Sequence, residues 1–238
     1  MTGVRMGEDS SRAGRSSNRA EWRKGYTQLD YEGWEKFKVL GPLLGELQDE
    51  GKIGELVVDV GSAYLPISQH IPGKHTLITI DYAGRATTAS MPILHADTVH
   101  IPYDAQNVAR QGSFDNKKAL VKVAKLLGTD PRNTRNAECA DTMLFSEILN
   151  YVDFRSTLLG FSRYLKPGGR FIIFNMPGRG YGERFAEKGV KNNTELRDFL
   201  TENGFAIEKA VFPRHVRPDD WDDSGMVFLV ARKKVEGE

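Results

Sequence analysis

A glycine turn and a carboxylate follow the first two apolar runs of the chain, at a spacing that suits a nucleoside ligand. The run Glu55–Val60 contains Asp59 and is followed by Gly61, a residue type that lets a ligand approach the backbone closely. The second run ends at Asp81, roughly 20 residues beyond the glycine turn. A carboxylate there can accept one hydrogen bond from each of two ribose hydroxyls. Together the two features predict a ribose-binding site.

A third apolar run, residues 92–96, is followed by Asp97 and Thr98. An acidic residue and a small polar residue just past a strand can reach the amino group of an adenine. Open parallel sheets bind ligands at the carboxyl ends of their strands, where the strand order reverses. We therefore expect the ends of the first three runs to meet in one site.

The elements that must position these residues are short β-branched runs that alternate with helical stretches. Such alternation is typical of βαβ units and predicts an α/β fold, a doubly wound and mostly parallel sheet with helices on both faces. We expect seven strands, at residues 55–60, 75–82, 92–96, 142–149, 170–176, 205–212 and 226–232. Helices are expected at residues 116–127, 155–165 and 194–202.

Three regions of different composition follow one another along the chain. Residues 1–25 are polar and rich in Arg and Ser, so we expect a disordered tail. Residues 26–52 carry apolar side chains at helical spacing, and Gly41-Pro42 is expected to split this segment into two helices. Residues 53–235 form the predicted α/β domain. The helical segment either covers the core or closes over a ligand, and the sequence leaves both roles open.

The segments around the fourth and fifth expected strands resemble the small-molecule class I S-adenosylmethionine-dependent methyltransferases. Residues 141–152 read DTMLFSEILNYV and residues 163–171 read RYLKPGGRF, in which the R-x-L-K-P-G-G turn is the most specific feature. The resemblance extends from about residue 53 to residue 232. It implies a Rossmann-like sheet with an antiparallel seventh strand. It also implies S-adenosylmethionine as the cofactor and methyl transfer to a small-molecule acceptor as the reaction.

By this resemblance, the predicted site residues divide according to the parts of the cofactor. The methionine part would face the glycine turn, ribose and adenine the next two strand ends, and the sulfonium the end of the fourth strand. In that order, the implied residues are Gly61, Ser62 and Ala63, then Asp81, Tyr82, Asp97 and Thr98, and finally Phe145 and Ser146. Asp59 would support the glycine turn. None of the five histidines is singled out as a catalytic base.

Two departures from the family pattern keep alternatives open. The pattern is roughly D-x-G-x-G-x-G, whereas this chain has Ala63 and Leu65 in place of the second and third glycines. The stretch between Asp97 and Asp141 is also long for one crossover. The main alternative is therefore a non-catalytic Rossmann-like protein that binds a cofactor or a partner, and a lesser one is an RNA methyltransferase. An NAD-dependent oxidoreductase is disfavoured, since the glycine pattern suits a pyrophosphate still less.

The overall composition argues against several classes of partner. The 33 basic and 32 acidic side chains give a net charge of +1, which provides no field for steering toward nucleic acid. No apolar run approaches the roughly 18–20 residues that span a bilayer. Cys139 is the single cysteine, which excludes an internal disulfide, disfavours a zinc cluster and fits a cytoplasmic protein. We expect a small-molecule substrate, no membrane association and no metal.

Overall fold

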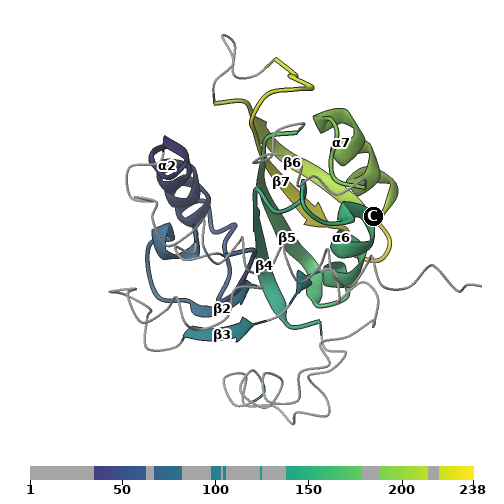
Figure 1. Cartoon of the computed structure of the whole chain (residues 1–238). Coiled ribbons are helices and arrows are strands. Elements are labelled where there is room, and N and C mark those ends of the chain that lie inside the picture. The colour runs from purple at the N-terminus through teal and green to yellow at the C-terminus, as the bar shows by residue number, and fades with distance from the viewer. Residues whose placement is uncertain are drawn as a thin grey trace, which may run out of the picture.

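The computed structural model describes residues 35–62, 67–81, 98–102, 104–105, 124, 138–177, 188–213 and 220–238. Their centre is a seven-stranded sheet with the order β3-β2-β1-β4-β5-β7-β6 (Figure 1). The strands are β1 (Leu56–Val60), β2 (Thr76–Asp81), β3 (Thr98–Pro102), β4 (Ala140–Ser146), β5 (Leu165–Asn175), β6 (Phe205–Val211) and β7 (Val227–Lys233). β7 is antiparallel to both of its neighbours, and the other pairs are parallel. The predicted α/β class, the number of strands and the antiparallel seventh strand are confirmed.

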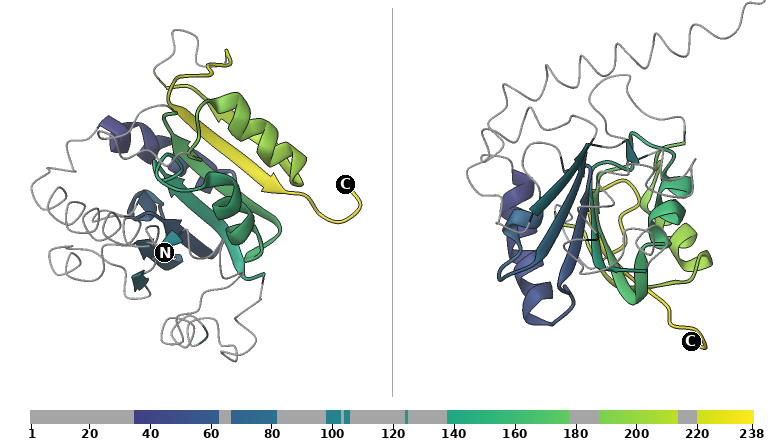
Figure 2. Two further views of the ribbon diagram at one scale, coloured as in Figure 1. Left: turned by 45° about the vertical axis from the view of Figure 1, so that its right-hand side comes forward. Right: turned by 90° about the horizontal axis from the view of Figure 1, so that it is seen from below.

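Helical elements cover both faces of this sheet, as Figure 2 shows from two further directions. On one face lie α2 (Glu35–Asp49) and the short 3-10 helix η3 (Ile67–His70), and on the other lie α6 (Phe154–Ser162) and α7 (Asn193–Glu202). The central strands are buried on both sides because successive side chains point to opposite faces. In β5, for example, Phe171 packs in the core under α6 and α7, whereas Ile172 packs in the core under α2.

The expectation that Gly41-Pro42 splits the first helical segment is wrong, because α2 runs continuously from Glu35 to Asp49 with Pro42 inside it. Proline removes the hydrogen bond that its N–H would donate to the carbonyl of Lys38. Lys38 and Pro42 are both exposed, so water can donate a hydrogen bond to the carbonyl of Lys38 instead. Leucines 40, 44 and 47 on the opposite side are buried against the sheet, and this packing holds the helix together.

The third strand also lies elsewhere than predicted. Residues 92–96 are outside the described residues, and the strand that pairs with β2 is Thr98–Pro102. The other predicted strands are present with shifted ends. β5, for example, begins at Leu165 instead of Arg170, because the K-P-G-G turn is part of the strand. The helix predicted at residues 116–127 is outside the described residues apart from Ala124.

The helices of the second half have capped ends. The Asp153 side chain accepts a hydrogen bond from the N–H of Ser156 at the start of α6, and the Asn192 side chain accepts one from the N–H of Glu195 at the start of α7. Such caps satisfy backbone donors that have no partner inside the helix. Among the described residues, no helix has the length and the apolar character needed to cross a membrane.

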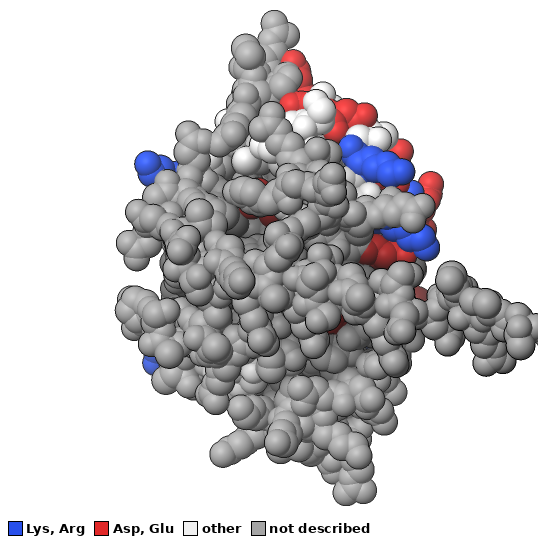
Figure 3. All heavy atoms as spheres, in the orientation of Figure 1, with Lys and Arg blue, Asp and Glu red and all other residues white. Residues whose placement is uncertain are grey.

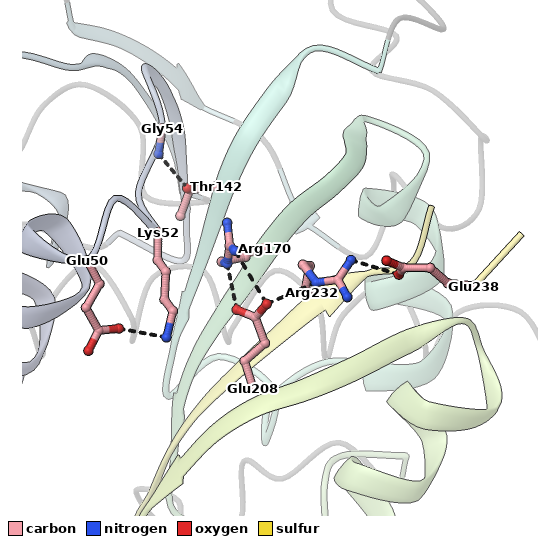
Figure 4. A network of polar contacts seen from close by, with 8 residues as sticks. All are labelled: Glu50, Lys52, Gly54, Thr142, Arg170, Glu208, Arg232 and Glu238. Carbon is pink, nitrogen blue, oxygen red and sulfur yellow. Dashed lines mark hydrogen bonds and ion pairs between the residues drawn. The ribbon is translucent and has the colours of Figure 1, made fainter. Parts of the chain in front are cut away.

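A polar network joins strands β5, β6 and β7 near the amino ends of the parallel strands (Figure 4). The carboxylate of Glu208 accepts hydrogen bonds from Arg170 at 2.7 Å and from Arg232 at 3.0 Å, and Arg232 also contacts Glu238. On the small part of this face that is described in Figure 3, basic and acidic side chains lie close together. Over the whole sequence the two charges are nearly balanced.

Candidate functional site

The carboxyl ends of the parallel strands form one edge of the sheet, opposite the Glu208 network. The register places Val60 of β1 beside Ile80 of β2 and beside Phe145 of β4. The chain moves outward from β1 through β2 to β3 and then returns to β4 on the other side of β1. The space above β1 and β4 is therefore the point where the strand order reverses, which is where open α/β sheets bind ligands.

Gly61 forms the turn at the end of β1 in a conformation that favours glycine. Its φ is 76°, and its N–H donates to the carbonyl of Ile80 at 2.8 Å. A Cβ at this position would lie 2.7 Å from Cδ1 of Ile148, in the turn that follows β4. The turns after β1 and β4 therefore pack against each other at the edge of the sheet.

Two buried hydroxyl groups lie beside this contact. Ser62 is 4% exposed and Ser146 is 9% exposed, and neither Oγ has a hydrogen-bond partner among the described residues. A buried hydroxyl without a partner is costly, so such groups commonly receive one from a ligand or from water. A ligand with hydrogen-bond acceptors at its polar end fits this part of the site.

Asp59 lies within β1, and its fully buried side chain points toward η3. Its Oδ2 accepts a hydrogen bond from the backbone N–H of Ser68 at 3.0 Å. The carboxylate therefore ties the strand to the crossover that follows the glycine turn. Burial lowers the pKa of His70, which ends η3.

The crossover between β1 and β2 is short. β1 ends at Val60 and β2 begins at Thr76, and the described helical part between them is the four-residue η3. Parallel strands are usually joined by an α-helix. Here the altered glycine pattern noted in the sequence coincides with an abbreviated crossover.

Asp81 ends β2 at the same edge and is half-buried. It pairs in register with Pro102, the last residue of β3. This places its carboxylate one strand away from the glycine turn. The spacing predicted from the sequence is therefore realised as a position at the carboxyl edge.

The structure corrects the placement of Thr98. It was expected just past the third strand but instead begins β3 and pairs with Leu77 near the start of β2. Because the two strands are parallel, Thr98 lies toward the opposite edge of the sheet, away from Asp81. The carboxylate that follows β3 is Asp104, which is half-buried and which the sequence reasoning missed. Its signal was present, since Asp104 follows the end of β3 at Pro102 after one intervening residue.

Phe145 and Ser146 were expected at the end of the fourth strand, and both are in β4. The ring of Phe145 is 1% exposed and makes edge-to-face contacts with Phe161 at 5.7 Å and with Phe171 at 5.2 Å. Its side chain is therefore part of the core and points away from the ligand edge, because alternate residues of β4 face α6. Only its backbone is near the site. Ala63, Tyr82 and Asp97 lie outside the described residues.

The sequence analysis also missed Glu147. Of the described non-glycine residues, it alone has a positive φ, at 53°. Its N–H donates to the carbonyl of Phe174 in β5 at 2.7 Å. Non-glycine residues rarely adopt this conformation, and the strain tends to occur at functional sites. No pattern of residue types distinguishes such a glutamate in advance.

Cys139 plays no part at this edge. It precedes β4 at the amino end of the strand, and burial raises the pKa of its thiol above the ordinary value. A raised pKa keeps the sulfur protonated and poorly nucleophilic. The structure thus gives this thiol the environment of a passive, partly buried side chain.

Comparison with known proteins identifies the fold. No protein-family model and no curated protein matches the sequence. The 1,6-didemethyltoxoflavin-N1-methyltransferase of Burkholderia thailandensis, solved with 1,6-didemethyltoxoflavin and S-adenosylhomocysteine, superposes with a TM-score of 0.64. Its identity is 13%, over 98% of this chain and 94% of that one. The N-methyltransferase NodS of Bradyrhizobium japonicum, in complex with S-adenosylhomocysteine, gives 0.59 at 16% identity, over 91% and 98% of the two chains.

The [4+2]-cyclase SpnF gives a TM-score of 0.56 at 16% identity, over 82% of this chain and 80% of that chain. At such identities the likeness concerns the fold. The sheet order with its antiparallel β7 agrees with these superpositions. The chain therefore has the fold of the class I S-adenosylmethionine-dependent methyltransferases.

Proposed function

We propose that this chain binds S-adenosylmethionine at the carboxyl edge of its sheet and transfers the methyl group to a small-molecule acceptor. The observation that carries the proposal is the set of groups gathered where the strand order reverses. A glycine turn, a carboxylate at ribose spacing and two buried hydroxyls without described partners lie at or beside this edge, as Gly61, Asp81, Ser62 and Ser146. These groups suit a ligand that joins an adenosine to a charged amino acid.

The roles follow from these positions. Gly61, Ser62 and Ala63 would line the methionine end, with Ser146 beside them, and Asp81 with Tyr82 would bind the ribose. Asp104 replaces Thr98 as a candidate for the adenine, and Asp97 remains the other candidate. Asp59 would hold the glycine turn through its hydrogen bond to Ser68. Phe145 would contribute its backbone alone.

When bound, S-adenosylmethionine supplies a methyl group that is already electrophilic. The chain then has to hold an acceptor in line with that methyl group and to exclude water, which is mainly a task of orientation. The closely packed turns after β1 and β4 suit this task, because the contact of Ile148 with Gly61 fixes their relative position. A mechanism that works by orientation needs turns that are held rigidly in this way.

A small-molecule acceptor agrees with the charge of the chain. A net charge of +1 gives no field that would concentrate a polyanion. The Burkholderia neighbour, solved with 1,6-didemethyltoxoflavin, acts on a small heterocycle. We place the reaction in the cytoplasm, since a single cysteine suits a reducing compartment.

Direct titration tests the proposal. The full chain should bind S-adenosylmethionine and S-adenosylhomocysteine with affinity on the order of micromolar, or about −8 kcal/mol. The readout is isothermal calorimetry at neutral pH, with thermal shift as a second probe. Absence of heat and of thermal shift at millimolar ligand would contradict the proposal.

A second function is favoured by the altered turn after β1. Ala63 and Leu65 replace two glycines of the family pattern, and the crossover that follows is short. A Rossmann-like protein that binds a partner without catalysis would tolerate both changes. The same titration separates the two functions, because a protein of this kind that has lost the cofactor site would show no binding of either ligand.

A further inference from the structure

The turn after β4 packs on the glycine turn through Ile148, and its first residue is Glu147. We propose that the carboxylate of Glu147 binds the α-ammonium group at the methionine end of the cofactor. This inference rests on the proposed function, since it assigns a partner to one charged group of the ligand proposed for that edge.

The backbone of Glu147 is in the left-handed region, with φ at 53°. Glycine or asparagine would adopt this conformation more readily than glutamate. A strained residue persists only where the surrounding structure determines it. Here the strain occurs at the carboxyl end of the central strand β4, directly after Ser146, whose hydroxyl lacks a described partner.

Three hydrogen bonds join this turn to residues 174–176, at the end of β5 and just beyond it. The N–H of Glu147 donates to the carbonyl of Phe174 at 2.7 Å, and Nδ2 of Asn150 donates to the carbonyl of Met176 at 2.9 Å. Because a carbonyl can only accept, this second bond fixes the orientation of the Asn150 amide. Its Oδ1 then accepts from Nδ2 of Asn175 at 3.1 Å. The turn is therefore held at both of its ends, at residues 147 and 150.

The contact between Ile148 and Gly61 brings this turn to the methionine end of the site. A Cβ on Gly61 would lie 2.7 Å from Cδ1 of Ile148, so the side chain of Ile148 packs directly on the glycine turn. Glu147, its immediate neighbour in the chain, thus lies at the junction of the β1 and β4 turns. Gly61 and Ser62 are the residues proposed to line the methionine end.

The other carboxylates in described residues near the ends of β1 to β4 have different positions. Asp59 is buried under the crossover and accepts a hydrogen bond from Ser68, and Asp81 lies one strand away at ribose spacing. Asp104 follows β3, which is further out in the sheet. An ammonium group in a partly dry site needs an anionic partner. Glu147 is the half-buried carboxylate on the β4 side that meets this need.

Three ligands that differ in charge test the assignment with Glu147→Gln. S-adenosylmethionine has the ammonium and the sulfonium, S-adenosylhomocysteine has the ammonium alone, and 5′-methylthioadenosine has neither. We expect the variant to bind the first two ligands roughly tenfold to a hundredfold more weakly. Its affinity for 5′-methylthioadenosine should stay within about twofold of the wild type, since that ligand has no group for Glu147 to bind. Calorimetry measures all three affinities.

Two controls accompany this variant. Glu138→Gln removes an equal charge at the amino end of β4, where Glu138 pairs with Lys233, and should leave all three affinities unchanged. Asp81→Asn should weaken all three ligands, because all three contain ribose. Glu147→Asn removes the carboxylate but suits the left-handed backbone, so it should show the same ligand pattern as Glu147→Gln in a stable fold.

The possible outcomes separate this inference from the proposed function. If the wild type binds none of the three ligands, the proposed function fails and this inference fails with it. If the wild type binds them and Glu147→Gln leaves both longer ligands unaffected, this inference alone is wrong. Selective weakening of S-adenosylmethionine would place Glu147 against the sulfonium and would overturn the ammonium assignment.

Discussion

The two halves of the sheet are built differently. The half formed by β4 to β7 has capped α-helices, an 11-residue strand β5 and the Glu208 network across three strands. In the half formed by β1 to β3, the strands have five or six residues, and the described helical part of the first crossover is the four-residue η3. The groups proposed for ribose and adenine belong to this second, shorter half.

The candidate site therefore depends on a few positions at the junction of a regular scaffold and an irregular edge. The β4 side supplies rigidity through the turn at residues 147–150, and the β1 side supplies the close approach at Gly61. Loss of a helix cap in the scaffold half should therefore alter stability alone, loss of the carboxylate at the end of β2 should alter ligand binding alone, and added bulk at the Gly61 junction should alter stability most. The following predictions test that contrast, beginning with the largest effect.

Replacing glycine in each half separates backbone strain from close packing. Gly61 and Gly168 both have a φ of 76°, but a Cβ would meet Ile148 at Gly61 and nothing within 4 Å at Gly168. We expect Gly168→Ala to lower the free energy of unfolding by about 1–2 kcal/mol through strain alone. Gly61→Ala should lower it by about 2–5 kcal/mol, since overpacking is added. Equal losses in urea unfolding would show that the two turns do not pack as described.

Removing the carboxylate at the end of β2 should affect binding and spare the fold. We expect Asp81→Ala to weaken S-adenosylhomocysteine roughly tenfold to a hundredfold, because hydrogen bonds to a charged acceptor are lost. Calorimetry gives the affinity, and circular dichroism checks the fold. Glu138→Ala serves as the control at the opposite edge. An unchanged affinity in Asp81→Ala would mean that Asp81 is not the ribose ligand.

Removing the caps of α6 and α7 should lower stability and leave ligand binding unchanged. Asp153→Ala and Asn192→Ala each lose a side-chain acceptor for a helix N–H, at a cost of about 1 kcal/mol. For a domain of this size, that loss lowers Tm by roughly 2–4 °C. The affinity for S-adenosylhomocysteine should not change. A weaker affinity in either variant would show that the scaffold half and the site are coupled.

The two halves should also respond to acid in different pH ranges. Burial lowers the pKa of His70 from its ordinary value of 6.5, so the folded state binds fewer protons than the unfolded state. Stability that depends on neutral His70 is present above pH 6.5 and falls as the pH drops below it. His70→Gln should therefore reduce the loss of Tm on going from neutral to mildly acidic pH.

The carboxyl group of Glu208 titrates in a lower pH range than His70. Partial burial acts to raise its pKa, but the hydrogen bond and charge of Arg170, with Lys52 and Arg232, bring the pKa below the ordinary value of 4.5. Its contribution to stability is present above pH 4.5 and is lost as the pH falls through the folded-state pKa. Glu208→Gln should flatten the Tm profile in that lower range and leave it parallel to the wild type above it. Parallel profiles throughout would contradict the assignment.

The smallest effect is expected from the amino-terminal residues. Residues 1–25 are polar and rich in Arg and Ser, so we expect little stabilisation of either half from apolar burial of this segment. A chain that begins at Tyr26 should melt within a few degrees of the full chain. Differential scanning calorimetry measures this, and a large fall in Tm would mean that the segment docks on the domain.

Local patterns in the sequence were enough to predict the main elements of the fold. The alternation of strands with helices predicted the α/β sheet, and the spacing of Asp59 and Asp81 predicted that both lie in or at the end of neighbouring strands. The turn at Gly61 was predicted because glycine readily adopts turn conformations that other residues disfavour. These features depend on residue type and on the period of two along a strand, which are local properties.

How those elements meet could be seen in the three-dimensional structure alone. The register of β3 places Thr98 at the opposite edge and leaves Asp104 as the carboxylate after the strand, and the pleat of β4 directs the Phe145 ring into the core. The contact of Ile148 with Gly61 joins residues far apart in the chain. The left-handed backbone conformation of Glu147 is held by the hydrogen bond that its N–H donates to β5. Strand register, the face of the sheet to which a side chain points and backbone strain depend on neighbours that are distant in sequence. Local sequence patterns therefore do not predict them.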